Sequence, residues 1–537
     1  MRILAYNPCH DGAAVLIENG RLSFALESEK DDGQRYDSIS PTLFVRSLAI
    51  TEPPDVVVVS GYIKGARSAK ELLRNGTEAG YFDEGPTGTS DSETLFVGRR
   101  VRRFSSSHVR SHIMCTYGLS PFPQGQPCYV LIWEGWIGAL YHVDEHVVIR
   151  KIGDVLSDPG DKYSILYGLA DPSLPVSARH WLRGEDAGKL MALAAYGRRD
   201  APTSEQQGLI ESIMSWNKLE FVRSGTSPKA ALSSSRFCDI GVESQDFKDL
   251  AWQFSAALFD RFYLFAKEHV MQGLPLLIAG GCGLNCEWNT HWRQCGLFAD
   301  VFVPPCPNDS GVALGAAIDA LRHYTGRAKI EWTVYAGDPF IEDVAAPPDF
   351  SCSALNLSDV CLRLLNGDVI AWVQGRYEIG PRALGNRSLL AAPFSTESRD
   401  KLNRIKQRES FRPIAPICLE DEFGLHFDHH GPSPHMLYFQ RVKSGQLTAI
   451  THVDGSARAQ SVNDSQNPEI CALLREFREQ SGVAVLCNTS LNFKGRGFIN
   501  RMSHLFEFAR ESGIDGLVVG TRFWKPRRRG SSCALGN

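Results

Sequence analysis

Two histidines spaced four residues apart are the first residues in this sequence that could do metal chemistry. His108 and His112 lie in the segment Ser-His-Val-Arg-Ser-His-Ile-Met, and on a helix residues four apart project from the same face. Two such imidazoles supply half of a divalent-metal site, and Asp309, just before a run of small residues, is the candidate third ligand. Val109 stands where the HExxH motif has its glutamate, so a metalloprotease is excluded. A solvated helix that happens to carry two histidines is the alternative interpretation.

A basic segment later in the chain could bind an anion. Nine Lys or Arg residues fall between Arg376 and Arg412, interleaved with Gly and Pro. Leu402 and Ile405 mark the inner face of a helix that Pro413 ends, which leaves the cations free to converge on one anion. Because guanidinium groups match phosphate oxygens two at a time, the segment predicts a nucleotide or acyl-phosphate site. A solvated basic face is the alternative.

Several polar turns complete the candidate chemistry. His10 lies where the first strand is expected to end, and an imidazole there could accept a proton from a substrate hydroxyl at neutral pH. The strand expected at 274–279 opens into a glycine turn, 280–285, which is typical of backbone that approaches a phosphate. The segments 451–460 and 486–492 are expected to be loops at strand ends that aim a few donors inward.

The composition excludes several classes of partner. The chain has 57 Lys+Arg and 61 Asp+Glu, a formal charge of −4, which lacks the basic surplus that nucleic-acid binding requires. No run of ~18 apolar residues occurs and the first residues lack the apolar core of a signal peptide, so we expect a cytoplasmic protein with no membrane partner. The 14 cysteines form no CxxC pair, which argues against a zinc ribbon or a disulfide framework.

The elements that must position these residues include a repeated pattern. Short apolar runs occur at 3–6, 13–17 and 22–26. An Asp-Gly turn separates the first two runs. The pair Asn19-Gly20 separates the second and third runs and predicts a hairpin. A similar series at 129–133, 137–143 and 147–152 contains Glu134-Gly135. Two such repeats indicate a duplicated fold unit, as in the ATPase superfamily of actin and sugar kinases. Helical periodicity covers 244–270, and the Pro-rich stretch 345–349 is the candidate domain boundary.

Eight motifs, taken in order along nearly the whole chain, resemble one family, the nodulation-type O-carbamoyltransferases and their antibiotic-biosynthesis branch. The motifs are His10-Asp-Gly-Ala-Ala, His108-x-x-x-His112, Ala279-Gly-Gly-Cys-Gly-Leu-Asn285, Asp309-Ser-Gly, Gly380-Pro-Arg-Ala-Leu-Gly-Asn-Arg-Ser388, Arg408-Glu-Ser-Phe-Arg-Pro-Ile-Ala-Pro416, His452-Val-Asp-Gly-Ser-Ala-Arg458 and Asn488-Thr-Ser-Leu-Asn492. The block that begins at Gly380 is long enough to be specific.

The resemblance implies an α/β protein of two domains. Residues 1–345 would form a KAE-like domain, which has the actin-like ATPase superfold with duplicated lobes, and residues 350–537 a YrdC-like α/β domain. The YrdC-like domain would form carbamoyl adenylate from ATP and carbamoyl phosphate. The KAE-like domain would then transfer the carbamoyl group to a hydroxyl of a small natural product, with an antibiotic intermediate as the expected acceptor.

The resemblance also implies roles for individual residues. His10 would be the general base. Carbamoyl phosphate and the adenylate would lie on Arg382, Arg387, Lys406, Arg412, Arg458 and Ser490, and the nucleotide near Gly280, Gly281 and Asn285. A divalent metal would be held by His108, His112 and Asp309; iron(II) is favoured by the resemblance, with manganese and zinc as alternatives, and magnesium is expected with ATP.

Four residues have no role that the sequence assigns, and two other functions stay open. Glu134 stands where many relatives carry Asp, Lys189 lies in a motif that departs from the family pattern, and Lys30 and Arg35 follow the third expected strand. A threonylcarbamoyl-tRNA modification enzyme is one alternative, which the near-neutral charge disfavours. A non-catalytic regulatory protein that binds nucleotide and metal is the other. A homo-oligomer is compatible with the sequence.

Overall fold

The computed structural model describes residues 1–62, 79–82, 88–176, 183–218, 225–428 and 431–527, and these form two compact units. The first unit contains Met1–Pro8, Ile17–Arg21 and Pro53–Glu331. The second unit contains Cys9–Leu16, Leu22–Glu52 and Trp332–Asn537. The second unit therefore includes N-terminal residues as well as the C-terminal third of the chain. The domain ranges 1–345 and 350–537 stay a prediction.

Two sheets are present among the described residues of the first unit. In one, the parallel strands β1 (Arg2–Asn7), β4 (Val56–Ser60) and β6 (Arg99–Ser106) are followed by the antiparallel edge strand β5 (Thr89–Phe96). The other has the order β11 (Val301–Phe302), β10 (Leu276–Ala279), β7 (Cys128–Trp133), β8 (Ile137–Val143) and β9 (Ile149–Ser157). The strands β4 and β7 are buried along their whole length, in agreement with their continuous apolar sequences.

Two helices pack against each other and against these sheets. Helix α3 (His108–Leu119) contacts β7 and β10, and helix α11 (Val312–Thr325) contacts β1 and β4. A Cβ atom at Gly315 would lie 1.7 Å from the carbonyl oxygen of Ser111, so only glycine permits this close helix contact. Every residue of α3 is buried. The solvated-helix interpretation of the two histidines is therefore wrong.

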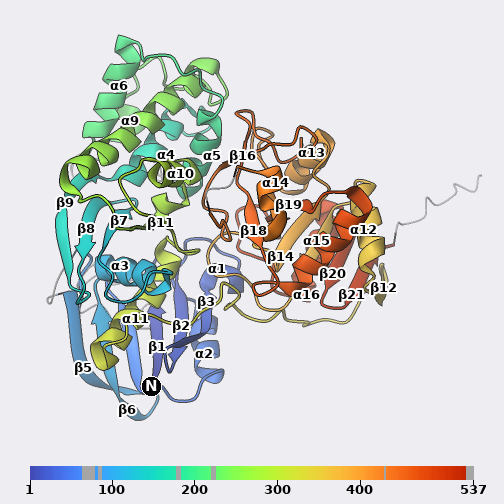
Figure 1. Cartoon of the computed structure of the whole chain (residues 1–537), viewed down its shortest axis with the longest axis horizontal. Helices are drawn as coiled ribbons and strands as arrows, with labels where there is room; N and C mark the ends of the chain where they lie inside the picture. Colours follow the sequence, from blue (N-terminus) through green and yellow to red (C-terminus); the bar gives the residue numbers. More distant parts are fainter. Residues whose placement is uncertain (63–78, 83–87, 177–182, 219–224, 429–430, 528–537) are drawn as a thin grey trace, which may run out of the picture. The chain divides into compact units, whose positions relative to one another are not determined.

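Two further predicted elements, a hairpin and a long helix, are confirmed. The Asn19-Gly20 turn joins β2 (Ala13–Glu18) to β3 (Arg21–Glu27), and both turn residues have positive φ, as a two-residue hairpin turn requires. The helix expected at 244–270 is α9 (Gln245–His269). In Figure 1, α9 lies at one end of the unit together with α4 (Pro159–Ala170), α5 (Gly184–Ala194) and α6 (Ser204–Ser215).

The second unit is built on one mixed sheet of eight strands. Their order is β12 (Phe350–Ala354), β21 (Arg522–Pro526), β20 (Gly516–Val519), β13 (Ile370–Val373), β14 (Arg387–Ala391), β19 (Val485–Ser490), β15 (Ala415–Leu419) and β18 (Gln460–Val462). One apolar core on this sheet includes residues of α12 (Leu357–Leu365) and α15 (Pro468–Ser481). A second core includes residues of α13 (Thr396–Ile405) and α16 (Met502–Ser512). The predicted α/β class is confirmed.

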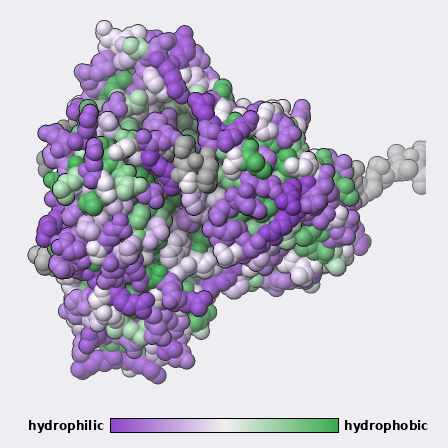
Figure 2. Space-filling view, viewed as in Figure 1, coloured by the Kyte–Doolittle hydropathy of each residue, from purple (hydrophilic) through white to green (hydrophobic). Residues whose placement is uncertain are grey.

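The face of the molecule in Figure 2 is mostly hydrophilic, with apolar side chains in small separate patches. Among the described residues, no helix is both long enough and apolar enough to cross a bilayer.

A buried lysine holds the N-terminal segment of the second unit in place. The Lys30 ammonium lies in α1 (Ser28–Asp31) and donates to Glu27 Oε1 (2.7 Å) and to the carbonyl oxygens of Glu378 (2.7 Å) and Gly380 (2.8 Å). The Gly380 N–H donates to the same Glu27 oxygen at 2.7 Å. Lys30 is therefore a structural residue that fixes the start of the Gly380 loop, and its three N–H donors are all used.

We expect Lys30→Met to lower the free energy of unfolding by about 3–5 kcal/mol, because the substitution leaves the buried Glu27 carboxylate without its cation. Chemical denaturation followed by tryptophan fluorescence measures this loss. Lys267→Met, at an exposed position of α9, is the control and should change stability by less than about 0.5 kcal/mol. A loss below about 1 kcal/mol for Lys30→Met would show that the buried ion pair contributes little.

Candidate functional site

Four side chains of the first unit form a candidate metal centre. The ligand atoms of His108, His112, Glu134 and Asp309 all lie within 4.8 Å of one another. The two Nε2 atoms are 3.1 Å apart, and each is 3.3 Å from Glu134 Oε2. Asp309 Oδ1 is 3.3 Å from His112 Nε2 and 3.7 Å from His108 Nε2. Two ligands of one ion, each about 2.1 Å from it, lie about 3 Å apart. The donors present therefore fit a divalent cation.

Three of the four ligands lie at the ends of secondary-structure elements, and His112 lies one turn into α3. Helix α3 begins at His108, where the Ser107 side chain caps it by accepting from the Arg110 N–H. Glu134 directly follows β7, and Asp309 opens the short helical turn before α11. These ends meet because α3 packs on β7 and on α11.

A buried ion pair fastens the two helices beside the centre. The Arg110 guanidinium donates to both carboxylate oxygens of Asp319, at 3.0 and 2.8 Å, and the Ser106 hydroxyl donates to Oδ2 at 2.7 Å. Such paired donors fix the separation of α3 and α11 more strictly than apolar packing alone.

The electrostatics of the centre favour ionised groups. Burial alone would raise the pKa of Glu134, but the two imidazoles lower it far below its usual range. Burial also opposes protonation of His112, yet hydrogen bonds with Asp309 and Glu134 raise its pKa to about 10. Without a cation, the proton held by His112 offsets part of the negative charge of the two carboxylates.

Two residues of the centre were not assigned from the sequence. Glu134, whose role was open, lies among the predicted ligands. Tyr81 donates its hydroxyl hydrogen to Glu134 Oε1 at 2.8 Å, and its ring stacks on His108 with the centroids 4.1 Å apart. Ligands are commonly oriented by such neighbouring groups. Tyr81 lies in a polar stretch without periodicity, so no local signal marked it, whereas the repeated acidic-Gly turn did mark Glu134.

The predicted nucleotide residues lie at the end of β10. Gly280 has φ of 93°, and a Cβ there would lie 2.4 Å from the Trp133 carbonyl oxygen, so glycine is required. Gly281 begins the following short helical turn, and the Asn285 side-chain oxygen caps α10 (Cys286–Gln294) by accepting from two backbone N–H groups. Nucleotide binding by these three residues stays a prediction.

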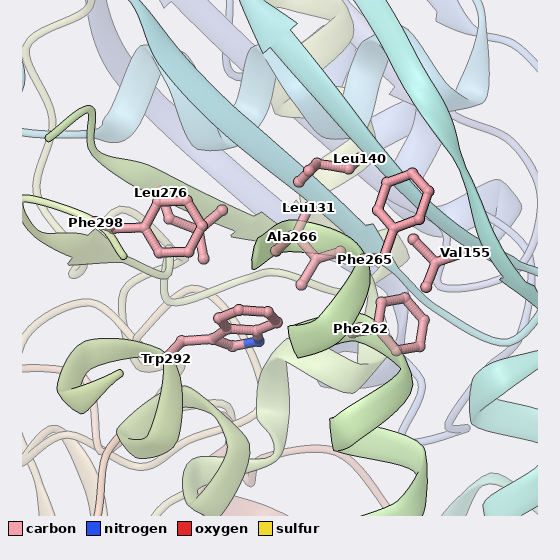
Figure 3. Close-up of a pocket in the computed structure, with 9 residues that line it drawn as sticks. All are labelled: Leu131, Leu140, Val155, Phe262, Phe265, Ala266, Leu276, Trp292 and Phe298. Atoms are coloured by element: carbon pink, nitrogen blue, oxygen red, sulfur yellow. The ribbon is translucent and has the colours of Figure 1, made fainter. Parts of the chain in front are cut away.

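A small cavity in the first unit is lined by no residue that could act as an acid, a base or a metal ligand. It lies among the side chains of β7 to β9, α9 and α10, and Figure 3 shows that its lining is aliphatic and aromatic. It is part of the core that supports β7.

The second unit contains a cluster of cations around Lys406. The buried Lys406 ammonium donates to the carbonyl oxygens of Ser490 (2.6 Å) and Asn492 (3.0 Å) and to Asn492 Oδ1, and lies 3.3 Å from Ser490 Oγ. A phosphate would therefore have to displace one of these acceptors to bind the ammonium. Burial, and then the positive charges of Arg408, Arg412 and Arg35, lower the pKa of Lys406 well below its usual value. An anion bound there would relieve this repulsion.

The same electrostatics place two more arginines in the cluster. Burial, with the charges of Arg412 and Arg458, lowers the pKa of Arg408 to about 9. Of the predicted residues, Ser490 contacts Lys406, Arg412 acts electrostatically on Lys406 and Arg408, and Arg458 acts on Arg408; their binding of a ligand stays a prediction. Arg408 was absent from the predicted set although it lies in the same basic segment, and Arg35 acts on the cluster from the N-terminal segment.

The predicted ligand Arg387 is used inside the protein instead. Its guanidinium is fully buried, and all five N–H donors have acceptors within 3.0 Å: the carbonyl oxygens of Gln374, Gly375 and Asn386, and Asn500 Oδ1, which accepts two. No N–H of Arg387 is left for a phosphate in this conformation. Arg382 lies five residues earlier, in the loop that precedes β14, with its Nε shielded from solvent.

His10 belongs to the second unit. Its imidazole is half exposed, stacks on Tyr36 with the ring centroids 5.3 Å apart, and has Nδ1 3.5 Å from Asp11 Oδ2. An accessible imidazole next to a carboxylate is suited to accept a proton.

Comparison with known proteins decides the family. The model described as "Carbamoyltransferase N-terminus" matches residues 95–318, and that described as "Carbamoyltransferase C-terminus" matches residues 362–525. The chain is 46% identical to a 3'-hydroxymethylcephem-O-carbamoyltransferase of Amycolatopsis lactamdurans over 99% of this chain and 100% of the relative. The chain belongs to the carbamoyltransferase family. The predicted family and class of enzyme are thus confirmed.

Other members of the family are similar over comparable lengths. A 3'-hydroxymethylcephem-O-carbamoyltransferase of Streptomyces clavuligerus is 44% identical over 98% of this chain and 99% of the relative. Nodulation protein U of Rhizobium tropici is 35% identical over 95% of this chain and 94% of that protein. A glucokinase structure from Streptomyces griseus, 12% identical, covers 60% of this chain and all of its own with a TM-score of 0.29, too low to argue from.

We expect His112→Ala to weaken binding of iron(II) or zinc by more than about 100-fold. In the parent protein, metal must displace the His112 proton, since the pKa of His112 is raised to about 10; affinity should therefore rise with pH between about 6 and 9, with proton release. Calorimetry in two buffers of different ionisation enthalpy measures both effects. His323→Ala, at a half-exposed histidine paired with Asp91, is the control. Unchanged metal affinity in His112→Ala would remove this centre from consideration.

Proposed function

We propose that this protein is an O-carbamoyltransferase that acts on the hydroxymethyl group of a cephem. The supporting observation is identity of 46% and 44%, over essentially whole chains, to two enzymes of that name. The Lys406 cluster and the His108 centre supply the anion site and the cation site that the chemistry needs.

The proposed first step takes place in the second unit, which would be YrdC-like. Carbamoyl phosphate, ATP and water give carbamoyl adenylate, pyrophosphate and phosphate. Lys406, Arg408, Arg412 and Arg458 would hold the phosphate oxygens, with Ser490 beside them. Arg382 would contribute from its loop, and Arg387 would position that loop through its internal hydrogen bonds.

The proposed second step uses the metal centre of the first unit, which would be KAE-like and actin-like in fold. His108, His112, Glu134 and Asp309 would hold the cation, with iron(II) favoured over manganese or zinc; magnesium would accompany ATP. When bound, the cation supplies positive charge next to the phosphate of the adenylate. Tyr81 would orient Glu134 and His108, and Gly280, Gly281 and Asn285 would lie along the nucleotide.

His10 would act as the general base of the transfer. Its imidazole would take the proton from the acceptor hydroxyl as the oxygen attacks the carbamoyl carbon and the bond to AMP breaks. Asp11 would stabilise the imidazolium that forms. The products are the carbamate ester and AMP.

Each of the two alternative functions predicts a different result from the transferase. A threonylcarbamoyl-tRNA enzyme would require tRNA for turnover, and a regulatory protein would bind ATP without releasing pyrophosphate. The cephem carbamoyltransferases and nodulation protein U are similar to this chain over nearly its whole length. This similarity favours the small-molecule transferase over both alternatives.

The test is to mix the protein with ATP, magnesium, iron(II) and carbamoyl phosphate, with and without a 3'-hydroxymethylcephem, and to follow pyrophosphate release and carbamate formation. We expect pyrophosphate release that depends on carbamoyl phosphate, and carbamoylated cephem when the acceptor is present. Absence of release under both conditions would contradict the proposal.

Lys406→Ala should lower carbamoyl-phosphate-dependent pyrophosphate release by more than about 100-fold, because a charged partner of the phosphate is removed. Metal affinity should not change, since the metal centre lies in the other unit. Lys401→Ala removes a lysine of the same helix that pairs with Asp515 instead, and it should retain nearly full release. Full release in Lys406→Ala would overturn the assignment of the site.

His10→Ala should leave pyrophosphate release intact and slow carbamoylation of the cephem by about 100- to 10,000-fold, the range for loss of a general base. Quenched-flow product analysis separates the two steps. His504→Ala, at an exposed position of α16, serves as the comparison. Carbamoylation at the full rate in His10→Ala would exclude His10 from proton transfer.

A further inference from the structure

Three accessible side chains of the second unit connect the His10 imidazole to the Arg35 guanidinium. The rings of His10 and Tyr36 stack with their centroids 5.3 Å apart. The guanidinium carbon of Arg35 lies 5.2 Å from the centroid of the same Tyr36 ring. The side chains of His10 and Arg35 are 48% and 31% exposed, and Tyr36 is 37% exposed. One small molecule can therefore contact both the imidazole and the guanidinium.

The backbone holds Arg35 and Tyr36 in one arrangement. Tyr36 has a φ of 63°, which is unfavourable for a bulky residue and persists only where the surrounding structure enforces it. Gly497 lies so close to the preceding turn that a Cβ atom there would be 1.8 Å from the Glu29 carbonyl oxygen. Backbone strain of this kind is concentrated at sites that bind ligands. The strain at an accessible aromatic residue therefore indicates a binding surface.

The Arg35 guanidinium has donors that the protein does not use. Its Nε donates to Glu29 Oε2 at 3.4 Å, which is longer than the ~2.8 Å of a strong charge-assisted hydrogen bond. Among the residues that the structure describes, no hydrogen bond uses either of its two terminal amino groups. These groups carry four of the five N–H donors of the side chain. Most of the guanidinium is therefore available to a ligand.

The charge and shape of the guanidinium suit a carboxylate. Burial alone would lower the pKa of Arg35, but Tyr36, Glu29 and Asp11 raise it, so the side chain stays charged. The two terminal amino groups of an arginine lie in one plane and pair with the two oxygens of a carboxylate through parallel hydrogen bonds. The ligand expected at Arg35 is therefore a planar anion.

We propose that Arg35 binds a carboxylate of the acceptor and so selects an acceptor whose hydroxymethyl group lies next to a carboxylate. This inference rests on the proposed function, since it takes a 3'-hydroxymethylcephem as the acceptor and His10 as the base. In that compound the carboxylate is bonded to the ring carbon next to the one that bears the hydroxymethyl group. With a hydrogen bond of ~2.8 Å at each end, the two groups can connect an imidazole and a guanidinium that both lie against the Tyr36 ring.

A phosphate bound by the Lys406 cluster is the other anion that Arg35 could meet. The positive charge of Arg35 does act on Lys406, but its effect on the pKa of Lys406 follows those of burial, Arg408 and Arg412. The contacts of Arg35 with Tyr36, and of Tyr36 with His10, instead join it to the group that would deprotonate the acceptor. This arrangement favours the acceptor carboxylate as the ligand.

The test compares two acceptors in the carbamoylation assay, a 3'-hydroxymethylcephem and the methyl ester of its ring carboxylate. The parent protein should have a kcat/KM at least about tenfold higher for the acid than for the ester, because only the acid pairs with Arg35. In Arg35→Gln this preference should fall about ten- to hundredfold. Arg35→Lys keeps the charge but loses the paired donors, so its preference should lie between the two.

Arg363→Gln is the matched control. The Arg363 side chain is 32% exposed, its Nη1 is 3.4 Å from Asp368 Oδ2, and its guanidinium carbon lies 5.2 Å from the centroid of the Phe523 ring, but it belongs to α12. Arg363→Gln should keep the full preference for the acid.

Three results would overturn the inference. They are equal kcat/KM for the acid and the ester in the parent protein, an unchanged preference in Arg35→Gln, and equal weakening of both acceptors, which is expected if Arg35 binds a phosphate. If Arg35→Gln does not fold, the acceptor comparison in the parent protein and in Arg35→Lys decides. If the parent protein carbamoylates neither acceptor, the proposed function itself fails, and the inference fails with it.

Discussion

Charged groups inside a protein need hydrogen-bond partners and, for full compensation, an opposite charge close by, and this constraint shapes both units of the carbamoyltransferase chain. In the first unit two imidazoles face two carboxylates, so protons or a cation can balance the centre. In the second unit Lys406 and its arginine neighbours repel one another, which lowers the pKa of Lys406 and of Arg408. The first arrangement therefore suits a cation, and the second suits an anion.

The metal centre depends on how closely two helices approach. Gly315 allows α11 to touch the backbone of α3, and the Arg110–Asp319 pair fixes the contact. A larger residue at Gly315 would push α11, and with it Asp309, away from the histidines. The small residues after Asp309 thus allow the close helix contact that keeps Asp309 near the two histidines.

The Lys406 cluster depends on a different arrangement, in which residues far apart in sequence share one compact unit. Lys30 ties the segment after β3 to the Gly380 loop, and the same segment carries Arg35 toward Lys406. Arg387 and Gln460 use their donors on carbonyl oxygens of that loop and of its surroundings. Many buried hydrogen-bond donors of the unit therefore hold the Gly380 loop in place, and these donors are not available to a ligand.

The sequence by itself determined features that depend on local spacing. Helical periodicity placed His108 and His112 on one face, the Asn19-Gly20 pair marked a turn, and the long Gly380 motif indicated the family. Tertiary structure decided whether each polar residue faces a ligand or the protein. Glu134 joins the metal centre because β7 ends beside α3, Tyr81 is brought there from a segment without periodicity, and Arg387 turns inward to backbone carbonyls. Residue type fixes what a side chain can bond, whereas its partner depends on packing between elements that are distant in sequence.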